Sequence, residues 1–118
     1  MTSRYPPVAL PKAPFAAELQ AHCLSFDGAF EDYPWGDIVY KAGTKMFAAI
    51  GGDNVLDVTL KASPEDAEAL LALPFVSRAR YVGRYGWITV EVRDESALDL
   101  VRDLIAASYA LVAPKRRR

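Results

Sequence analysis

The sequence contains a single cysteine and a single histidine among its 118 residues. One cysteine excludes an internal disulfide framework, and one cysteine with one histidine argues against a zinc site within a single chain. An excess of charge of one sign is also lacking, because 14 Lys and Arg stand against 15 Asp and Glu. This balance excludes a broadly polybasic nucleic-acid coat and an acidic tail, but it allows a local basic patch.

Long apolar runs are missing as well. No run approaches the roughly 20 residues that a helix needs to cross a bilayer. The N-terminal residues are interrupted by Pro6, Pro7 and Pro11 and lack the continuous apolar stretch of a signal peptide. We therefore expect a cytoplasmic protein with no membrane partner.

The chain contains enough apolar residues to build one hydrophobic core. Hydrophobic residues make up 52% of the chain, and its length fits one ordinary domain. We expect a Pro-rich extended leader over residues 1–13, one domain over residues 14–113 and a basic tail over residues 114–118. Neither end is expected to contribute to the core, because prolines interrupt the leader and Pro114 precedes the basic run.

Helical spacing of apolar residues predicts three helices. The first is expected from near Pro14, with Phe15, Leu19, Cys23 and Phe26 on one stripe. The second is expected from Ser63-Pro64-Glu65-Asp66 to Pro74, because serine caps, proline suits the first helical turn and acids favour its positive end. The third is expected from Asp94 to Val112, with the clearest amphipathic pattern of the three.

Between the helices the apolar residues alternate with a period of two, which predicts strands. The expected strands are residues 37–41, 45–50, 55–61 and 87–92, with a possible edge strand over residues 76–81. Short turns between the first three require antiparallel pairing. The predicted fold class is therefore α+β, with an antiparallel sheet of about four to five strands and helices packed on one face.

No arrangement of residues predicts catalysis, a cofactor or a metal. His22 and Cys23 are adjacent on the first helix and therefore diverge by about 100°, so they do not form a nucleophile–base pair. His22 is interpreted as a helix-boundary residue and Cys23 as a small core residue. The acids at 27, 31, 32 and 37 do not have the spacing of a calcium loop, and capping or pairing with nearby lysines explains them.

Basic and aromatic residues give the main functional prediction. Arginine interleaved with aromatic side chains is what phosphate contact combined with base stacking would use. Trp87 falls on the polar face of its predicted strand, and a hairpin around Gly43 is expected to project as a small wing. The C-terminal Lys-Arg-Arg-Arg run would add phosphate affinity without sequence preference, and Lys41, Lys45 and Lys61 form a second basic set. The candidate nucleic-acid-binding residues are Lys41, Lys45, Arg78, Arg80, Arg84, Tyr85 and Trp87.

Two other interpretations remain open. In the first, an aromatic pocket binds a small aromatic or anionic metabolite or drug, with Lys41 or Arg84 orienting an anionic group. The residues of that pocket would be Trp35, Tyr40, Phe47, Tyr81 and Trp87. In the second, the aromatic face is buried by a protein partner, in a scaffold that is a monomer or a homodimer. Edge-strand solvation alone would also explain the arginines.

The ordered motifs resemble those of the MmcQ/YjbR-like family across residues 14–113. They are Glu31-Asp32-x-Pro34-Trp35-Gly36, Val39-Tyr40-Lys41-x-Gly43-x-Lys45-Met46-Phe47-Ala48, Lys61, Tyr81-Val82-Gly83-Arg84-Tyr85-Gly86-Trp87-Ile88, and Ser108-Tyr109-x-Leu111-Val112. Members often have Phe where Trp35 stands, and the leader and the final arginine run depart from the family pattern.

The resemblance implies a bacterial protein with a small frataxin-like α+β fold and no known enzymatic activity. DNA binding through a double-wing arrangement of hairpins has been suggested for such proteins, which agrees in kind with the basic and aromatic residues above. The frataxin-like comparison also raises iron binding, but the first predicted helix has only Glu18 before Asp27 and lacks an acidic ridge. The leading prediction is a non-catalytic DNA-binding module.

Overall fold

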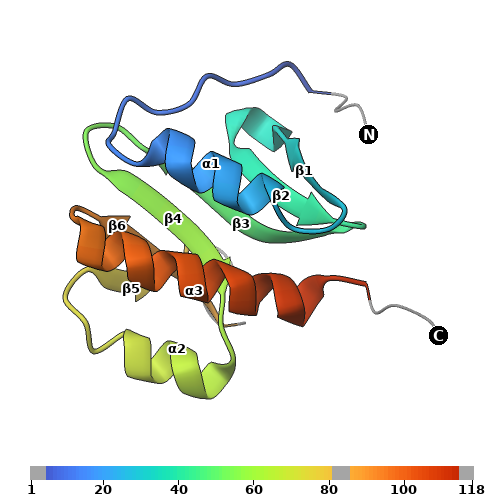
Figure 1. Ribbon diagram of the computed structural model, residues 1–118. Coiled ribbons are helices and arrows are strands. Elements are labelled where there is room, and N and C mark those ends of the chain that lie inside the picture. The colour runs from blue at the N-terminus through green and yellow to red at the C-terminus, as the bar shows by residue number, and fades with distance from the viewer. Residues whose placement is uncertain (1–4, 81–85, 115–118) are drawn as a thin grey trace.

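The computed structural model describes residues 5–80 and 86–114, apart from the side chain of Trp35. Figure 1 shows a sheet with helices in front of it. In chain order the elements are α1 (Ala16–Leu24), β1 (Ala29–Asp32), a 3-10 turn η1 (Pro34–Gly36), β2 (Ile38–Ala42), β3 (Lys45–Gly52), β4 (Leu56–Lys61), α2 (Pro64–Leu70), β5 (Val76–Arg78), β6 (Trp87–Val92) and α3 (Glu95–Val112). None of the described helices is both long and apolar enough to span a bilayer.

The predicted α+β class with an antiparallel sheet is confirmed. The sheet has six strands in the order β1-β2-β3-β4-β6-β5, and every neighbouring pair is antiparallel. Strands β2, β3 and β4 form the expected meander, and β1 extends it at one edge. After β4 the chain passes through α2 to the outer strand β5 and returns as β6 between β4 and β5 (Figure 1).

One strand was not predicted from the sequence. The segment Ala29–Asp32 pairs with β2 along its whole length, from Ala29 opposite Ala42 to Asp32 opposite Val39. It has only four residues and ends on two acids, so it gives too short an alternation to identify a strand. The sheet therefore has more strands than the four to five expected.

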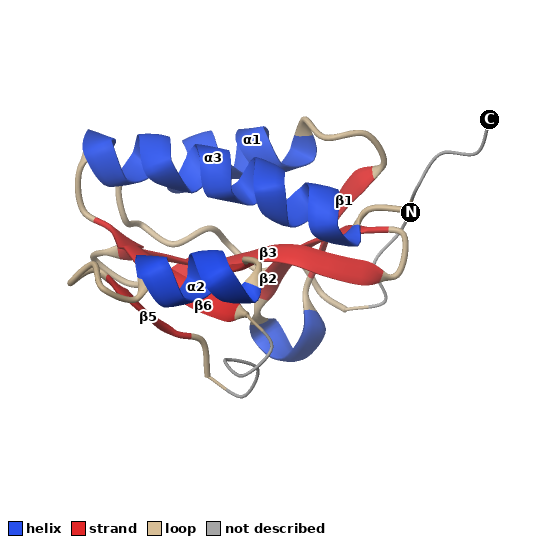
Figure 2. Cartoon of the chain, turned by 90° about the horizontal axis from the view of Figure 1, so that it is seen from below, coloured by secondary structure: helices blue, strands red, loops and turns tan. Residues whose placement is uncertain are grey.

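Helices α1 and α3 cover one face of the sheet, whereas α2 lies level with the sheet near β5 (Figures 1 and 2). Two of the helices start where capping chemistry places them, since Ser63 Oγ accepts from the Asp66 amide and Asp94 Oδ1 accepts from the Ala97 amide. No side chain caps α1. Its N-cap residue, Phe15, has a left-handed φ of 76°.

The core lies between the sheet and the helices α1 and α3. Side chains from both layers are fully buried there, among them Leu19, Tyr40, Phe47, Val101 and Ile105. Phe47 meets the rings of Phe26 and Tyr109 with edge-to-face geometry. These contacts fix the sheet against α3 and leave its other face uncovered by α1 or α3.

The expectation that the leader adds nothing to the core is wrong. Ala13 is buried in the core, and Val8 and Leu10 pack against it. The prolines of the leader prevent helix and central strand, but they do not prevent an extended segment from covering apolar surface.

Candidate nucleic-acid interface

The candidate site lies on the open face, which we define as the face of the sheet turned away from α1 and α3. On β4 and β6 the side chains alternate strictly between buried and half-buried positions. The half-buried residues therefore lie on the open face: Asp57, Thr59, Lys61, Trp87, Thr89 and Glu91. The hydroxyls of Thr59 and Thr89 are 2.9 Å apart and join the two strands on this face.

Strand register brings a set of cationic and apolar residues into line on the open face. Phe30 of β1 is opposite Lys41 of β2, and Lys41 is opposite Met46 of β3. Lys61 of β4 is opposite Trp87 of β6, near the same end of the sheet. We call these five half-buried residues the cation–aromatic row.

Lys41 is held within the row by an ion pair. Its Nζ lies 2.8 Å from Oδ2 of Asp32, a carboxylate whose side chain is 11% exposed. This confirms the expectation that lysines pair with some of the acids in residues 27–37. The ion pair ties β1 to β2 and fixes the direction of the Lys41 side chain.

Lys61 is positioned from the other side of the sheet. The Lys61 amide donates to Ser108 Oγ of α3 at 2.9 Å, and the same hydroxyl donates to the Phe47 carbonyl oxygen at 2.6 Å. Ser108 is fully buried. One serine therefore joins α3 to both β3 and β4 directly beneath the row.

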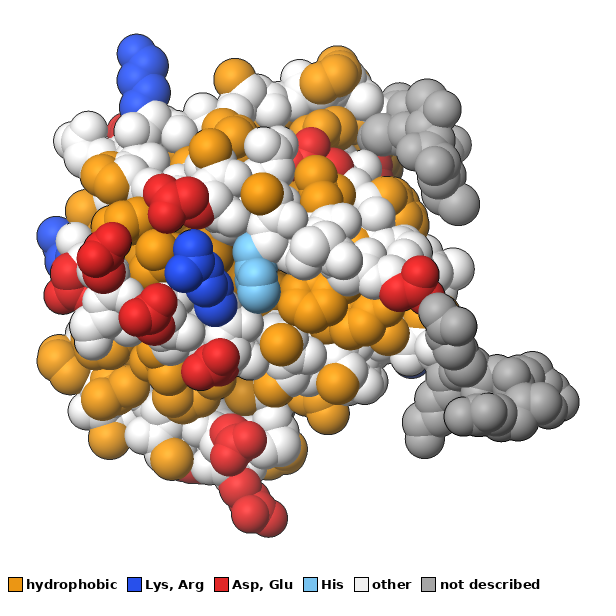
Figure 3. All heavy atoms as spheres, in the orientation of Figure 1, with side chains coloured by type: hydrophobic (Ala, Val, Ile, Leu, Met, Phe, Trp, Pro, Cys, Tyr) orange, Lys and Arg blue, Asp and Glu red, His pale blue; other side chains and the backbone are white. Residues whose placement is uncertain are grey.

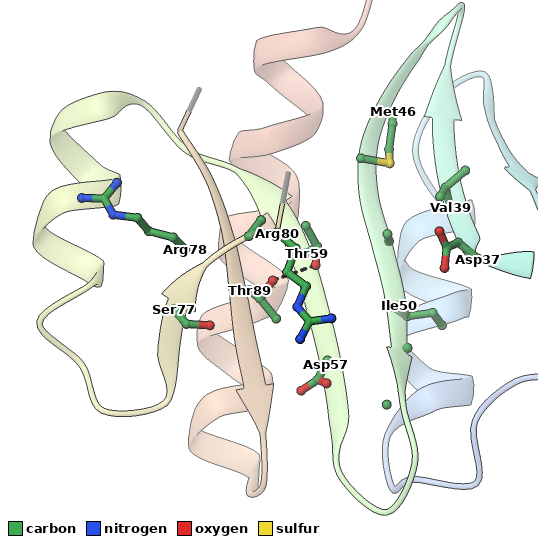
Figure 4. A pocket seen from close by; sticks show the side chains of 14 residues that line it. Asp37, Val39, Met46, Ile50, Asp57, Thr59, Ser77, Arg78, Arg80 and Thr89 are labelled. Atoms are coloured by element: carbon green, nitrogen blue, oxygen red, sulfur yellow. Dashed lines mark hydrogen bonds between the residues drawn. The ribbon is translucent and has the colours of Figure 1, made fainter. Parts of the chain in front are cut away.

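A groove of about 620 Å³ runs along the open face beside the row. Figure 4 shows Arg80 reaching over the sheet toward Asp57, with Thr59 and Thr89 between the strands below it. Asp57 lies opposite Glu91. Burial, and then the nearby Glu91 carboxylate, raise the pKa of Asp57, although Arg93 lowers it in part. Acids therefore gather at the end of the groove away from the row.

The remaining predicted nucleic-acid residues have different positions. Lys45 is exposed at the start of β3, and Arg80 is exposed beside the groove. Arg78 forms an exposed ion pair of 2.9 Å with Glu68 of α2. Arg84 and Tyr85 lie outside the described residues.

The predicted aromatic pocket does not form among its described members. Tyr40 and Phe47 are fully buried in the core on the helix-covered face, whereas Trp87 is on the open face. These three side chains therefore do not line a common cavity. Tyr81 and the side chain of Trp35 lie outside the described part of the chain.

Sequence reasoning missed a polar network centred on Glu31. Its carboxylate accepts hydrogen bonds from Tyr33 at 2.5 Å, from Tyr40 at 2.7 Å and from Gln20 at 2.7 Å. Burial raises the pKa of Glu31, but these hydrogen bonds outweigh burial and hold the pKa below its ordinary value. The network ties α1 and β1 to β2.

His22 and Cys23 occupy the positions expected for structural residues. The His22 ring lies against Phe26, and its Nε2 is 3.1 Å from the Arg102 carbonyl oxygen, which joins α1 to α3. Cys23 is fully buried, and burial raises the pKa of its thiol to about 12. Cys23 is therefore a core residue, as predicted.

The fold gives no support to an iron site among the described residues. There, no three His, Cys, Asp or Glu side chains come together as metal ligands. Glu31 already has three hydrogen-bond donors, and Asp32 is paired with Lys41. The donor set that hard cations need is not assembled by these acids.

Phe30, Met46 and Lys61 are the members of the row that were not predicted as site residues from the sequence. Phe30 belongs to the missed strand β1, and Met46 precedes an irregularity in the pairing of β2 with β3. Had the strand been recognised, alternation within β1 would have placed Phe30 and Glu31 on opposite faces of the sheet.

Comparison with known proteins identifies the family. The YjbR family model matches residues 24–111, which span most of the sheet and α3. The chain belongs to the YjbR family. The predicted family resemblance is thus confirmed, and the match includes the whole cation–aromatic row. No curated protein matches the chain.

Solved structures agree with this assignment. The crystal structure of Deinococcus radiodurans protein DR2400, with a DUF419 domain, is 26% identical and covers 80% of this chain and 75% of that one, with a TM-score of 0.73. A Pseudomonas syringae protein, target PsR293, is 21% identical, covers 81% of this chain and 97% of that one, and has a TM-score of 0.64. The second similarity concerns the fold alone.

Proposed function

We propose that this YjbR-family chain is a non-catalytic DNA-binding module whose contact surface is the cation–aromatic row. The observation that carries the proposal is strand register. It brings Lys41, Lys61 and Trp87, from three different strands, to one end of the open face. Lysine beside a half-buried aromatic ring on the open face offers both phosphate attraction and stacking.

Cations outside the row would extend the contact. Lys45 and Arg80 are exposed, and neither forms an ion pair within the described residues. Arg78 is paired with Glu68, but both side chains are more than half exposed. Exposed pairs contribute little stability, so Arg78 can exchange its carboxylate for a phosphate at small cost.

The modest net charge of the chain fits a localised contact. With a formal charge of -1, the protein has no general attraction for DNA. Binding must then depend on a few cations, and the affinity should fall steeply as salt rises. The DNA-binding suggestion that accompanies the family resemblance agrees with this interpretation. Predicted contacts from Arg84 and Tyr85 belong to the same proposal.

The test is a titration of labelled DNA by fluorescence anisotropy at several salt concentrations. We expect a complex at micromolar protein in low salt. The variants Lys45→Gln and Lys61→Gln should each weaken binding and lower the slope of log affinity against log salt by about 1. The matched control is Lys12→Gln, since Lys12 is an exposed lysine in the leader.

A salt-sensitive complex that Lys45→Gln and Lys61→Gln both weaken and Lys12→Gln does not would support the proposal. Absence of binding to duplex and single-stranded DNA at low salt would refute it. Equal losses from all three lysine variants would also contradict it, because that result indicates non-specific attraction.

A further inference from the structure

The helix side of the molecule is unsuited to DNA. Helices α1 and α3, which cover one face of the sheet, contain four acidic residues and one arginine, Arg102. All four acids are exposed: Glu18, Glu95, Asp99 and Asp103. Figure 3 shows acidic side chains around a single basic one on part of this face. If one of these helices were inserted into a groove of a DNA duplex, its carboxylates would lie close to the phosphates and repel them.

The turn of the β2–β3 hairpin lies next to the segment that follows α3. A Cβ atom added at Gly43, in this turn, would lie 3.0 Å from Pro114 Cγ. The predicted wing around Gly43 therefore has Pro114 beside it.

The open face offers a different kind of contact. The row has a large apolar ring at each end, Phe30 on β1 and Trp87 on β6, with lysines next to both. Four strand spacings separate β1 from β6, which corresponds to about 19 Å. Within the described residues, neither ring belongs to the core or to the side chains packed against it.

We infer that the row binds an unpaired DNA strand in preference to a duplex. Bases within a duplex are covered on both faces by their neighbours, so they cannot stack on Phe30 or Trp87. Unpaired bases can, and stacking on aromatic side chains requires no particular sequence. Lys41 and Lys61 then hold phosphates between the two stacked positions. The inference rests on the proposed DNA-binding function and specifies its ligand.

The experiment compares two labelled probes by anisotropy in low salt. One is an oligothymidylate of about ten nucleotides, and the other is a fully paired duplex of matched charge. We expect at least about tenfold tighter binding of the single strand. Phe30→Ala and Trp87→Ala should each weaken that binding by about fivefold or more, which corresponds to the loss of one stacked base. The affinity of Trp87→Phe for the single strand should stay within about threefold of that of the unmodified protein, because an aromatic ring is kept at this position.

The control is Leu111→Ala, which removes an apolar side chain that is 51% exposed on α3. Its affinity should be unchanged. Circular dichroism and thermal melting verify that each variant is folded, and the preference of the unmodified protein for single strands tests the inference without any variant. Equal affinity for the two probes, or unchanged binding by folded Phe30→Ala and Trp87→Ala, would overturn the inference while the proposed function stands. Failure to bind either probe would overturn both.

Discussion

The hydroxyl of Ser108 in α3 donates a 2.6 Å hydrogen bond to the carbonyl oxygen of Phe47 in β3. The oxygen of this Ser108 hydroxyl also accepts a hydrogen bond from the Lys61 amide. A single buried side chain thus connects the helix layer to the two strands that carry the centre of the cation–aromatic row. The position of Lys61 on the open face depends on a contact made from the opposite face.

Ser108→Ala should lower the free energy of unfolding by about 2 kcal/mol, because it leaves the buried Phe47 carbonyl and the part-buried Lys61 amide without their partner. Urea denaturation measures this change. Ser96→Ala is the matched control, since Ser96 is exposed in the first turn of α3. The control should change stability by less than about 0.5 kcal/mol. Similar effects of both substitutions would contradict the role given to Ser108.

Glu31 should make the stability of the protein depend on pH. Its pKa in the folded protein is below the ordinary value of 4.5, because hydrogen bonds to the carboxylate outweigh burial. The unfolded chain therefore binds more protons between the two pKa values, and stability rises with pH through that interval. The stabilisation is complete above the unfolded pKa and is lost as pH falls through the folded pKa.

Glu31→Gln should consequently lower stability most near neutral pH, with a difference from the unmodified protein that shrinks in acid. Urea denaturation from about pH 7 to about pH 3 measures it. The control Glu65→Gln, at an exposed position in α2, should change the free energy of unfolding by less than about 0.5 kcal/mol over the whole pH range. A Glu31→Gln difference that is constant over the whole range would show that the carboxylate is not stabilised by its three donors.

Cys23 should be chemically silent in the folded protein. Its thiol is buried and has a pKa of about 12, so almost no thiolate is present at neutral pH. An alkylating reagent followed by mass spectrometry should detect no modification of the native chain over hours and complete modification in denaturant. Rapid alkylation under native conditions would mean that α1 opens away from the sheet.

Asp57 should be a mildly destabilising residue. It faces Glu91 across the strand pair, and burial together with this neighbour raises its pKa. Asp57→Asn should therefore increase the free energy of unfolding at neutral pH by about 0.5 kcal/mol, through relief of like-charge repulsion. Asp103→Asn, on the exposed face of α3, provides a control for a change of net charge. A loss of stability in Asp57→Asn would indicate that Arg93 or Arg80 offsets the repulsion.

The sequence predicted the elements whose signals are local. Asp94 and the apolar stripe up to Val112 were enough to place α3, and strict alternation placed β4 and β6 with Trp87 on the open face. Strand β1 was missed because four residues show too little periodicity. Pro6 and Pro7 exclude a helix or a central strand in the leader, but they carry no information on burial, so they could not predict that Ala13 reaches the core.

The site was less predictable, because it depends on pairing between distant segments. Lys41 and Trp87 were predicted as candidates and Lys61 was not, and no local pattern aligns the three residues. Their alignment requires the register of the meander, including the irregularity after Tyr40, and the insertion of β6 beside β4. The gathering of exposed acids on the covered side is likewise visible only once α1 and α3 are placed on the same face of the sheet.

The most direct test of the account is a map of backbone amide shifts by heteronuclear NMR during titration with the oligothymidylate. The account predicts that the largest changes fall on the cation–aromatic row, at Phe30, Lys41, Met46, Lys61 and Trp87, and that they fade at high salt. Amides on the exposed faces of α1 and α3 should barely move. Changes concentrated on those helices, or no changes at low salt, would contradict the assignment of DNA to the open face.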